Sequence, residues 1–192
     1  NMSNRLYQYL FAGISIELLL FAFLFLSKGS LGEVFRLSAR YTGRISFGVY
    51  IIMFSYFIKE KANGLDLQKT YSWGMVFCVL HFIHFIFLSL NVYINQVPLV
   101  PYKLTGGFLA YLAILVYPFY LTKINRLLIH LIYFYYVGIV MAMTFLARIR
   151  GEFVGSPRSL FHYFGILIVA LFFLITAIKF LKIRKPFRGE KF

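Results

Sequence analysis

Six long apolar stretches follow one another along this chain and leave little sequence between them. A helix that crosses the hydrocarbon core of a bilayer needs about 20 mostly apolar residues, within a range of about 17–25. The breaks between the stretches carry Gly, Pro, Asn or basic residues, which end helices or mark membrane boundaries. The sequence therefore predicts six transmembrane helices, at about 10–26, 41–58, 73–92, 104–122, 127–147 and 160–178.

The composition agrees with lipid as the main solvent of the chain. Of the 192 residues, 61% are apolar and 14% are charged, whereas soluble domains have about 45–50% and about 25%. A soluble enzyme, a disordered chain and a disulfide scaffold are excluded, the last because Cys78 is the single cysteine. We expect an all-α polytopic membrane protein with one domain over 1–192, whose short loops make consecutive helices antiparallel neighbours.

The net charge of +14 allows two interpretations, nucleic-acid binding or contact with anionic lipid. The apolar content favours lipid, and we expect no nucleic-acid partner. Twelve Lys and Arg lie on the side of the termini and eight on the other side, so the positive-inside rule predicts both termini in the cytoplasm. We expect the inner membrane of a bacterium. The twelve are Arg5, Lys59, Lys61, Lys69, Lys123, Arg126, Lys179, Lys182, Arg184, Lys185, Arg188 and Lys191, and the eight are Lys28, Arg36, Arg40, Arg44, Lys103, Arg148, Arg150 and Arg158.

All four histidines fall within the predicted spans, and three of them are the main candidates because His162 lies nearer the end of its span. His81 and His84 share one face of the third span, and His130 lies one turn into the fifth. Counted from the span ends, His130 matches the depth of His81 to within about 6 Å and that of His84 to within about 10 Å. Imidazoles on facing helices suit axial ligation of a heme iron. The alternative is that they are interior side chains that hydrogen-bond across helices.

Two further charged residues bear on function. Glu17 is the one acid well inside a span, where it could accept a proton, pair with an arginine or face a polar crevice. Arg44, at the start of the second span, could pair with heme propionates or extend to the membrane surface as a topology signal. No GxGxxG, P-loop or HExxH motif is present, so no nucleotide fold or zincin site is encoded.

Several short segments between about residues 28 and 182 match the motifs of a known family, in the same order along the chain. They are Tyr41-Thr42-Gly43-Arg44, Gly74 ten residues before His84, Pro101-Tyr102 followed by Gly107-Phe108, Pro118-Phe119-Tyr120-Leu121-Thr122, Arg126-Leu127 before His130 and Tyr133, and Ser156-Pro157 before Gly165. Together they resemble the ferric-reductase-like transmembrane domain. Within it the chain is most similar to the YedZ family, the heme-binding membrane subunit of the periplasmic methionine sulfoxide reductase system.

The resemblance implies one or two b-type hemes with His84 and His130 as ligands. His81 could replace His84, and Met143 stands where the family has a second histidine in the fifth span. Methionine can ligate heme iron or simply pack. The implied function is electron transfer across the bilayer, from a separate cytoplasmic reductase or quinol to a periplasmic acceptor, with flavin only in a partner. The rival hypothesis is a cofactor-free transporter or assembly scaffold, in which Glu17 and Arg44 form the polar pathway.

Overall fold

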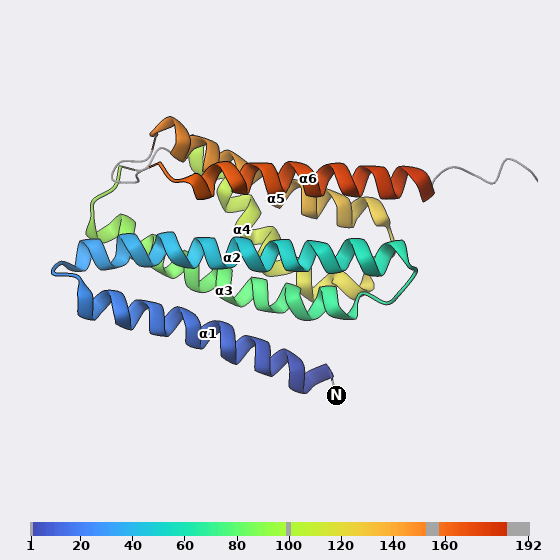
Figure 1. Ribbon diagram of the computed structural model, residues 1–192, viewed down its shortest axis with the longest axis horizontal. Coiled ribbons are helices and arrows are strands. Elements are labelled where there is room, and N and C mark those ends of the chain that lie inside the picture. Colours follow the sequence, from blue (N-terminus) through green and yellow to red (C-terminus); the bar gives the residue numbers. More distant parts are fainter. Residues whose placement is uncertain (1, 99–100, 153–157, 184–192) are drawn as a thin grey trace, which may run out of the picture.

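A computed structural model of the chain describes residues 2–98, 101–152 and 158–183 (Figure 1). All the regular elements in this part are helices. They are α1 (Met2–Ser27), α2 (Leu31–Ala62), α3 (Gln68–Ile94), α4 (Pro101–Tyr120), the 3-10 helix η1 (Leu121–Lys123), α5 (Leu127–Arg150) and α6 (Leu160–Ile183). Most of the basic C-terminal run and the Ser156-Pro157 segment lie outside the described residues.

Five of the described helices are long and apolar enough to cross a membrane, which makes this a multi-pass membrane protein: α1, α3, α4 with η1, α5 and α6. The exception is α2, whose sequence carries charged residues at both ends and Arg44 in between. Its 32 residues span about 48 Å, which exceeds the thickness of about 30 Å of a hydrocarbon core.

The helices run roughly along one axis, with α2 in the middle (Figure 1). Each helix contacts the next one along the chain, as the short loops predicted, and α2 also contacts α6. The α2–α3 pair is antiparallel over its full length. Asn95 Nδ2 donates to the carbonyl of Gly32 at one end (2.9 Å), and Glu60 binds the start of α3 at the other.

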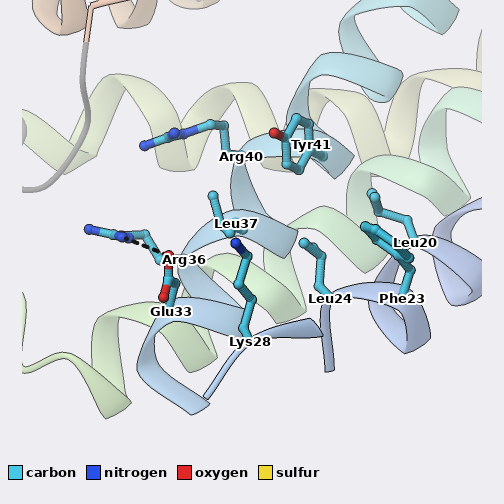
Figure 2. A pocket seen from close by; sticks show the side chains of 9 residues that line it. All are labelled: Leu20, Phe23, Leu24, Lys28, Glu33, Arg36, Leu37, Arg40 and Tyr41. Atoms are coloured by element: carbon cyan, nitrogen blue, oxygen red, sulfur yellow. Dashed lines mark ion pairs between the residues drawn. The ribbon is translucent and has the colours of Figure 1, made fainter. Parts of the chain in front are cut away.

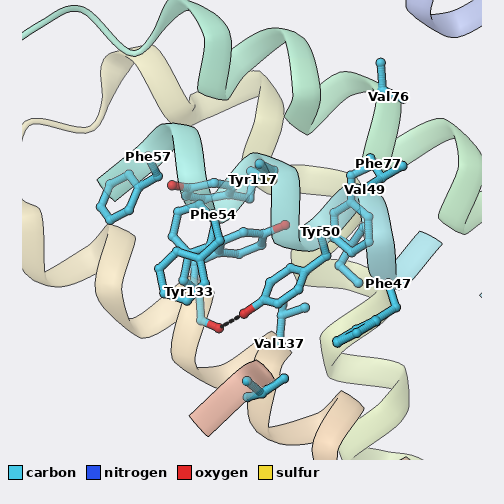
Figure 3. Packing of buried hydrophobic residues seen from close by; sticks show 14 of the residues in the cluster. Phe47, Val49, Tyr50, Phe54, Phe57, Val76, Phe77, Tyr117, Tyr133 and Val137 are labelled. Carbon is cyan, nitrogen blue, oxygen red and sulfur yellow. Dashed lines mark hydrogen bonds between the residues drawn. The ribbon is translucent and has the colours of Figure 1, made fainter. Parts of the chain in front are cut away.

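The core is built from aromatic rings around α2 (Figure 3). The Phe134 ring stacks on the rings of Phe54 and Phe57, with centroid distances of 4.5 and 4.6 Å. Tyr50, which is 0% exposed, donates its hydroxyl to the carbonyl of Phe134 at 2.7 Å. The buried hydroxyl of Tyr50 therefore has a hydrogen-bond partner, which offsets the cost of removing it from water.

Glu60 caps α3 from the last turn of α2. Its Oε1 accepts the backbone N–H of Lys69 (2.9 Å), and its Oε2 accepts the N–H and hydroxyl of Thr70 (2.9 and 2.6 Å). Leu67, at the N-cap position of α3, cannot supply such a bond from its own side chain. The carboxylate therefore satisfies free N–H groups of the first helical turn and complements its dipole.

Glu60→Ala is expected to lower the free energy of unfolding by about 2–3 kcal/mol, because the buried N–H and hydroxyl of Thr70 and the partly buried N–H of Lys69 lose their acceptor. Thermal unfolding in detergent measures the effect. Glu33→Ala is the matched control, since the one ion pair of the Glu33 side chain within the described residues is an exposed contact with Arg36 at 3.7 Å, and the change should alter stability by less than about 0.5 kcal/mol. Equal losses in the two variants would contradict the capping role.

Candidate functional site

Two hydroxyl side chains of α2 anchor the two histidines of α3. Ser46 Oγ lies 2.6 Å from Nδ1 of His81, and Thr42 Oγ1 lies 3.1 Å from Nδ1 of His84. Because the helices are antiparallel, residues four apart on α2 meet residues three apart on α3. The two imidazole centroids are 5.4 Å apart, and both rings lie on the face of α3 that packs on α2.

The hydrogen bonds of Thr42 determine which nitrogen of His84 carries the proton. The hydroxyl donates its single hydrogen to the carbonyl of Ser38 at 2.8 Å, so its oxygen can only accept from His84. Nδ1 of His84 is therefore the N–H, and Nε2 keeps its lone pair. No hydrogen bond to that Nε2 is present within the described part of the chain. This is the arrangement that metal-ligating histidines commonly have, with one nitrogen bonded to an orienting group and the other open.

Gly43 makes room for the His84 ring. A Cβ atom at this position would lie 2.9 Å from Cε1 of His84. Any side chain would therefore displace the ring or separate α2 from α3. Two of the three residues in the Thr42-Gly43-Arg44 segment thus serve the position of His84: one holds Nδ1 and the other leaves the space.

His130 has the opposite arrangement and differs from the role that the sequence predicted. Its Nε2 lies 2.9 Å from the carbonyl of Ile124, which can only accept, and its Nδ1 lies 2.6 Å from the hydroxyl of Tyr117. The neutral ring donates through one nitrogen and accepts through the other, so no lone pair is left for iron. His130 is 0% exposed and joins the start of α5 to α4 and the segment after η1.

His130 and His84 also lie at different depths, so the expectation that they are matched was wrong. His130 packs against Phe57 of α2, with ring centroids 5.5 Å apart, whereas His84 bonds Thr42. These α2 residues are separated by about 22 Å of helix rise. The error arose at the start of α3, which begins at Gln68 rather than near residue 73 and so places His81 and His84 deeper from that end.

Arg44 and Met143 do not face the imidazoles of α3. The Arg44 guanidinium lies over the Phe161 ring at 4.8 Å and donates to Ser159 Oγ at 3.3 Å, so it extends to the start of α6. Met143 is 57% exposed, on the outer side of α5. Of the five residues predicted for the site, the structure brings only His81 and His84 together.

Positive charge gathers near His84. Arg148 at the end of α5 is within electrostatic reach of His84, and it interacts in the same way with Arg40 and Arg44 of α2. The three like charges repel one another.

Sequence reasoning missed the hydroxyls that position the histidines. Ser38, Thr42 and Ser46 are spaced four residues apart, which places them on one face of α2, and all three are 0% exposed. These three hydroxyl residues on one face of an otherwise apolar segment could have indicated a polar contact with a neighbouring helix. Tyr111 of α4, whose ring lies 4.6 Å from that of His81, carried no such signal.

Comparison with known proteins found no similar protein. No family model, no curated protein and no solved structure matches the chain.

A b-type heme with His84 and His130 as its two axial ligands does not fit this arrangement. The two imidazoles lie at different depths along α2, and both nitrogens of His130 are already hydrogen-bonded. Of the two histidines, His84 is the better axial-ligand candidate: its Nε2, which faces α2 at Gly43, makes no hydrogen bond among the described residues, its ring is oriented by Thr42, and Arg148 is within electrostatic reach. A single histidine ligand is sufficient for heme in globins and peroxidases.

Proposed function

We propose that the protein binds one heme through His84 and carries electrons across a membrane. The observation that carries the proposal is His84, whose Nδ1 is held by Thr42, whose Nε2 makes no hydrogen bond among the described residues, and which is within electrostatic reach of Arg148. Similarity of Thr42-Gly43-Arg44, and of Gly74 ten residues before His84, to the ferric-reductase-like domain supports the same function. The heme, when bound, supplies a reversible one-electron carrier.

The residues of the chain have separate parts in this proposal. His84 would ligate the iron through Nε2, while Thr42 keeps the ring in the required tautomer and orientation. Arg148 and Arg40 would neutralise the propionates. His81, anchored by Ser46 in the same way, is the alternative ligand. His130 is a structural residue that joins α4 to α5.

We further propose that α2 is a sixth span, with both termini in the cytoplasm. Its antiparallel packing along the whole of α3, itself long and apolar enough to span, supports this. The 12-to-8 bias of Lys and Arg supports the orientation in a bacterial inner membrane. Electrons would then enter from a cytoplasmic reductase or quinol, with any flavin in that partner, and leave to a periplasmic acceptor.

An absorption spectrum of the purified protein tests the proposal. We expect a Soret band that shifts on reduction, in protein made with added heme or reconstituted with hemin. The rival, a cofactor-free transporter or scaffold, predicts a colourless protein under both conditions. A colourless protein that is folded by circular dichroism would contradict heme binding.

A further inference from the structure

Glu17 is a carboxyl group without a partner in the interior of the bundle. It is 0% exposed, and neither carboxyl oxygen has a hydrogen-bond partner among the described residues. Contacts one turn away on either side place it on the inner face of α1. Gly13 abuts Leu80 of α3, and Phe21 packs against Phe35 of α2 and Phe87 of α3. A charged carboxylate in such a setting is strongly disfavoured, so the neutral acid is the resting form.

The neighbours of Glu17 offer no counter-charge in contact with it. Interpolation between the flanking contacts places it level with His84 on α3 and close to Ser38 on α2, whose hydroxyl oxygen is also buried without a partner. Arg40 and Tyr41 of α2 are further titratable groups on this side, and Glu17 makes no ion pair or hydrogen bond with either in the described part of the chain. α1 itself contributes no second charged group near this level.

A cavity of about 580 Å³ between α1 and α2 is lined on the α1 side by Leu20, three residues from Glu17, although Glu17 itself is not part of its lining (Figure 2). Its inner end is formed by Leu20, one turn from Glu17, and its outer end by Lys28, Glu33 and Arg36 around the α1–α2 connection. The volume is enough for more than ten water molecules at about 30 Å³ each. The charged outer end connects this space to bulk water.

We propose that Glu17 is an exchangeable proton site, served by water in the cavity between α1 and α2. The acid form is the resting state, and the proton leaves to and returns from the side of the Lys28–Glu33 connection. The function is distinct from heme binding and does not require it. In this proposal a proton enters the membrane interior between α1 and α2 and binds to Glu17.

Reaction with dicyclohexylcarbodiimide tests for the protonated carboxyl. This apolar reagent reacts with a neutral acid: the carboxyl oxygen bonds to the central carbon while the proton moves to a nitrogen as the C=N π bond breaks, and the product rearranges to a stable N-acylurea. Peptide mapping by mass spectrometry should find the adduct on Glu17. The labelling rate should fall at least about tenfold between about pH 5 and about pH 9, because the ionised form does not react. Glu17→Gln should lose the adduct, and Glu60, held by three hydrogen bonds, should remain unlabelled in both proteins.

Cysteine accessibility tests the water path. Leu20→Cys and Leu19→Cys, each with Cys78→Ser, are compared in proteoliposomes with a charged methanethiosulfonate reagent. The two positions have nearly the same depth, but Leu20 lines the cavity and Leu19 is 70% exposed on the outer face of α1. We expect Leu20→Cys to react at least about tenfold faster, since charged reagents react in water and not in lipid.

Three results would overturn the proposal. They are a Glu17 that stays unlabelled at every pH, a labelling rate independent of pH, and equal reactivity of the two cysteines. None of these measurements uses heme, so a colourless protein that passes them contradicts the electron-transfer proposal alone. A Soret band without pH-dependent labelling contradicts the proton site alone.

Discussion

His84→Ala is expected to abolish the Soret band, whereas His130→Ala should keep it. The first change removes the one nitrogen whose lone pair is open beside the basic side chains. The second removes a ring whose nitrogens both have hydrogen-bond partners within the protein. His130→Ala should instead cost about 2–3 kcal/mol of stability, because the Tyr117 hydroxyl and the Ile124 carbonyl lose their partner. Spectra and thermal unfolding of the same preparations measure the two effects.

Thr42→Val is the finer variant of the same experiment. It keeps the shape of the side chain but removes the oxygen that accepts from Nδ1 of His84. Heme affinity should fall about tenfold, as is common when a group that orients a metal ligand is lost. Ser46→Ala, beside His81, is the matched control and should leave the affinity within about twofold of the parent.

Two outcomes would contradict the assignment of His84. A band that survives His84→Ala and disappears in His81→Ala would move the ligand by one turn along α3. A band that disappears in His130→Ala, while the protein stays folded, would restore the pair implied by the sequence resemblance. Both are read from the same set of spectra.

The transmembrane character could be predicted from the sequence because hydrophobic length alone determines it. Five of the predicted spans match long apolar helices. The second span was the weakest in hydropathy, with Arg44 in its first turn, and α2 is the helix that falls outside the five. Its packing partners on several sides explain the sequence, since a central helix can carry buried hydroxyls such as those of Thr42 and Ser46 where side chains of a neighbouring helix hydrogen-bond to them.

The site could be predicted only in part, because depth and direction are not encoded in hydropathy. A helix that extends past its apolar stretch, as α3 does, shifts the apparent depth of every residue counted from that stretch. Likewise α5 is apolar on all sides, so no periodicity shows that Met143 faces outward while Phe134 faces the core. The bonds that occupy His130 come from Tyr117 and Ile124; the sequence predicts the chain reversal between them but not which atoms it brings together.

Gly138→Leu is expected to be strongly destabilising. A Cβ atom on Gly138 of α5 would lie 2.6 Å from the hydroxyl of Tyr50 and 2.8 Å from Cζ of Phe173, so α5 touches α2 and α6 here without space for a side chain. The Tyr50 hydroxyl could move only by giving up its bond to the Phe134 carbonyl. Overpacking and the lost hydrogen bond together should cost about 3–5 kcal/mol.

Gly138→Ala and Gly48→Ala form the controlled comparison, because the same atom is added in each. A Cβ on Gly48 of α2 meets no atom within 4 Å, so that change should be neutral or stabilise by up to about 1 kcal/mol. Gly138→Ala should instead lower the unfolding temperature. Tyr50→Phe in the Gly138→Ala background should recover part of the lost stability, because it removes the atom nearest to the new Cβ. The stability of the double variant should therefore be higher than the sum of the two single effects predicts. A Gly138→Ala protein as stable as the parent would show that α5 can move away from α2 at little cost, and the close contact would then not hold the bundle together.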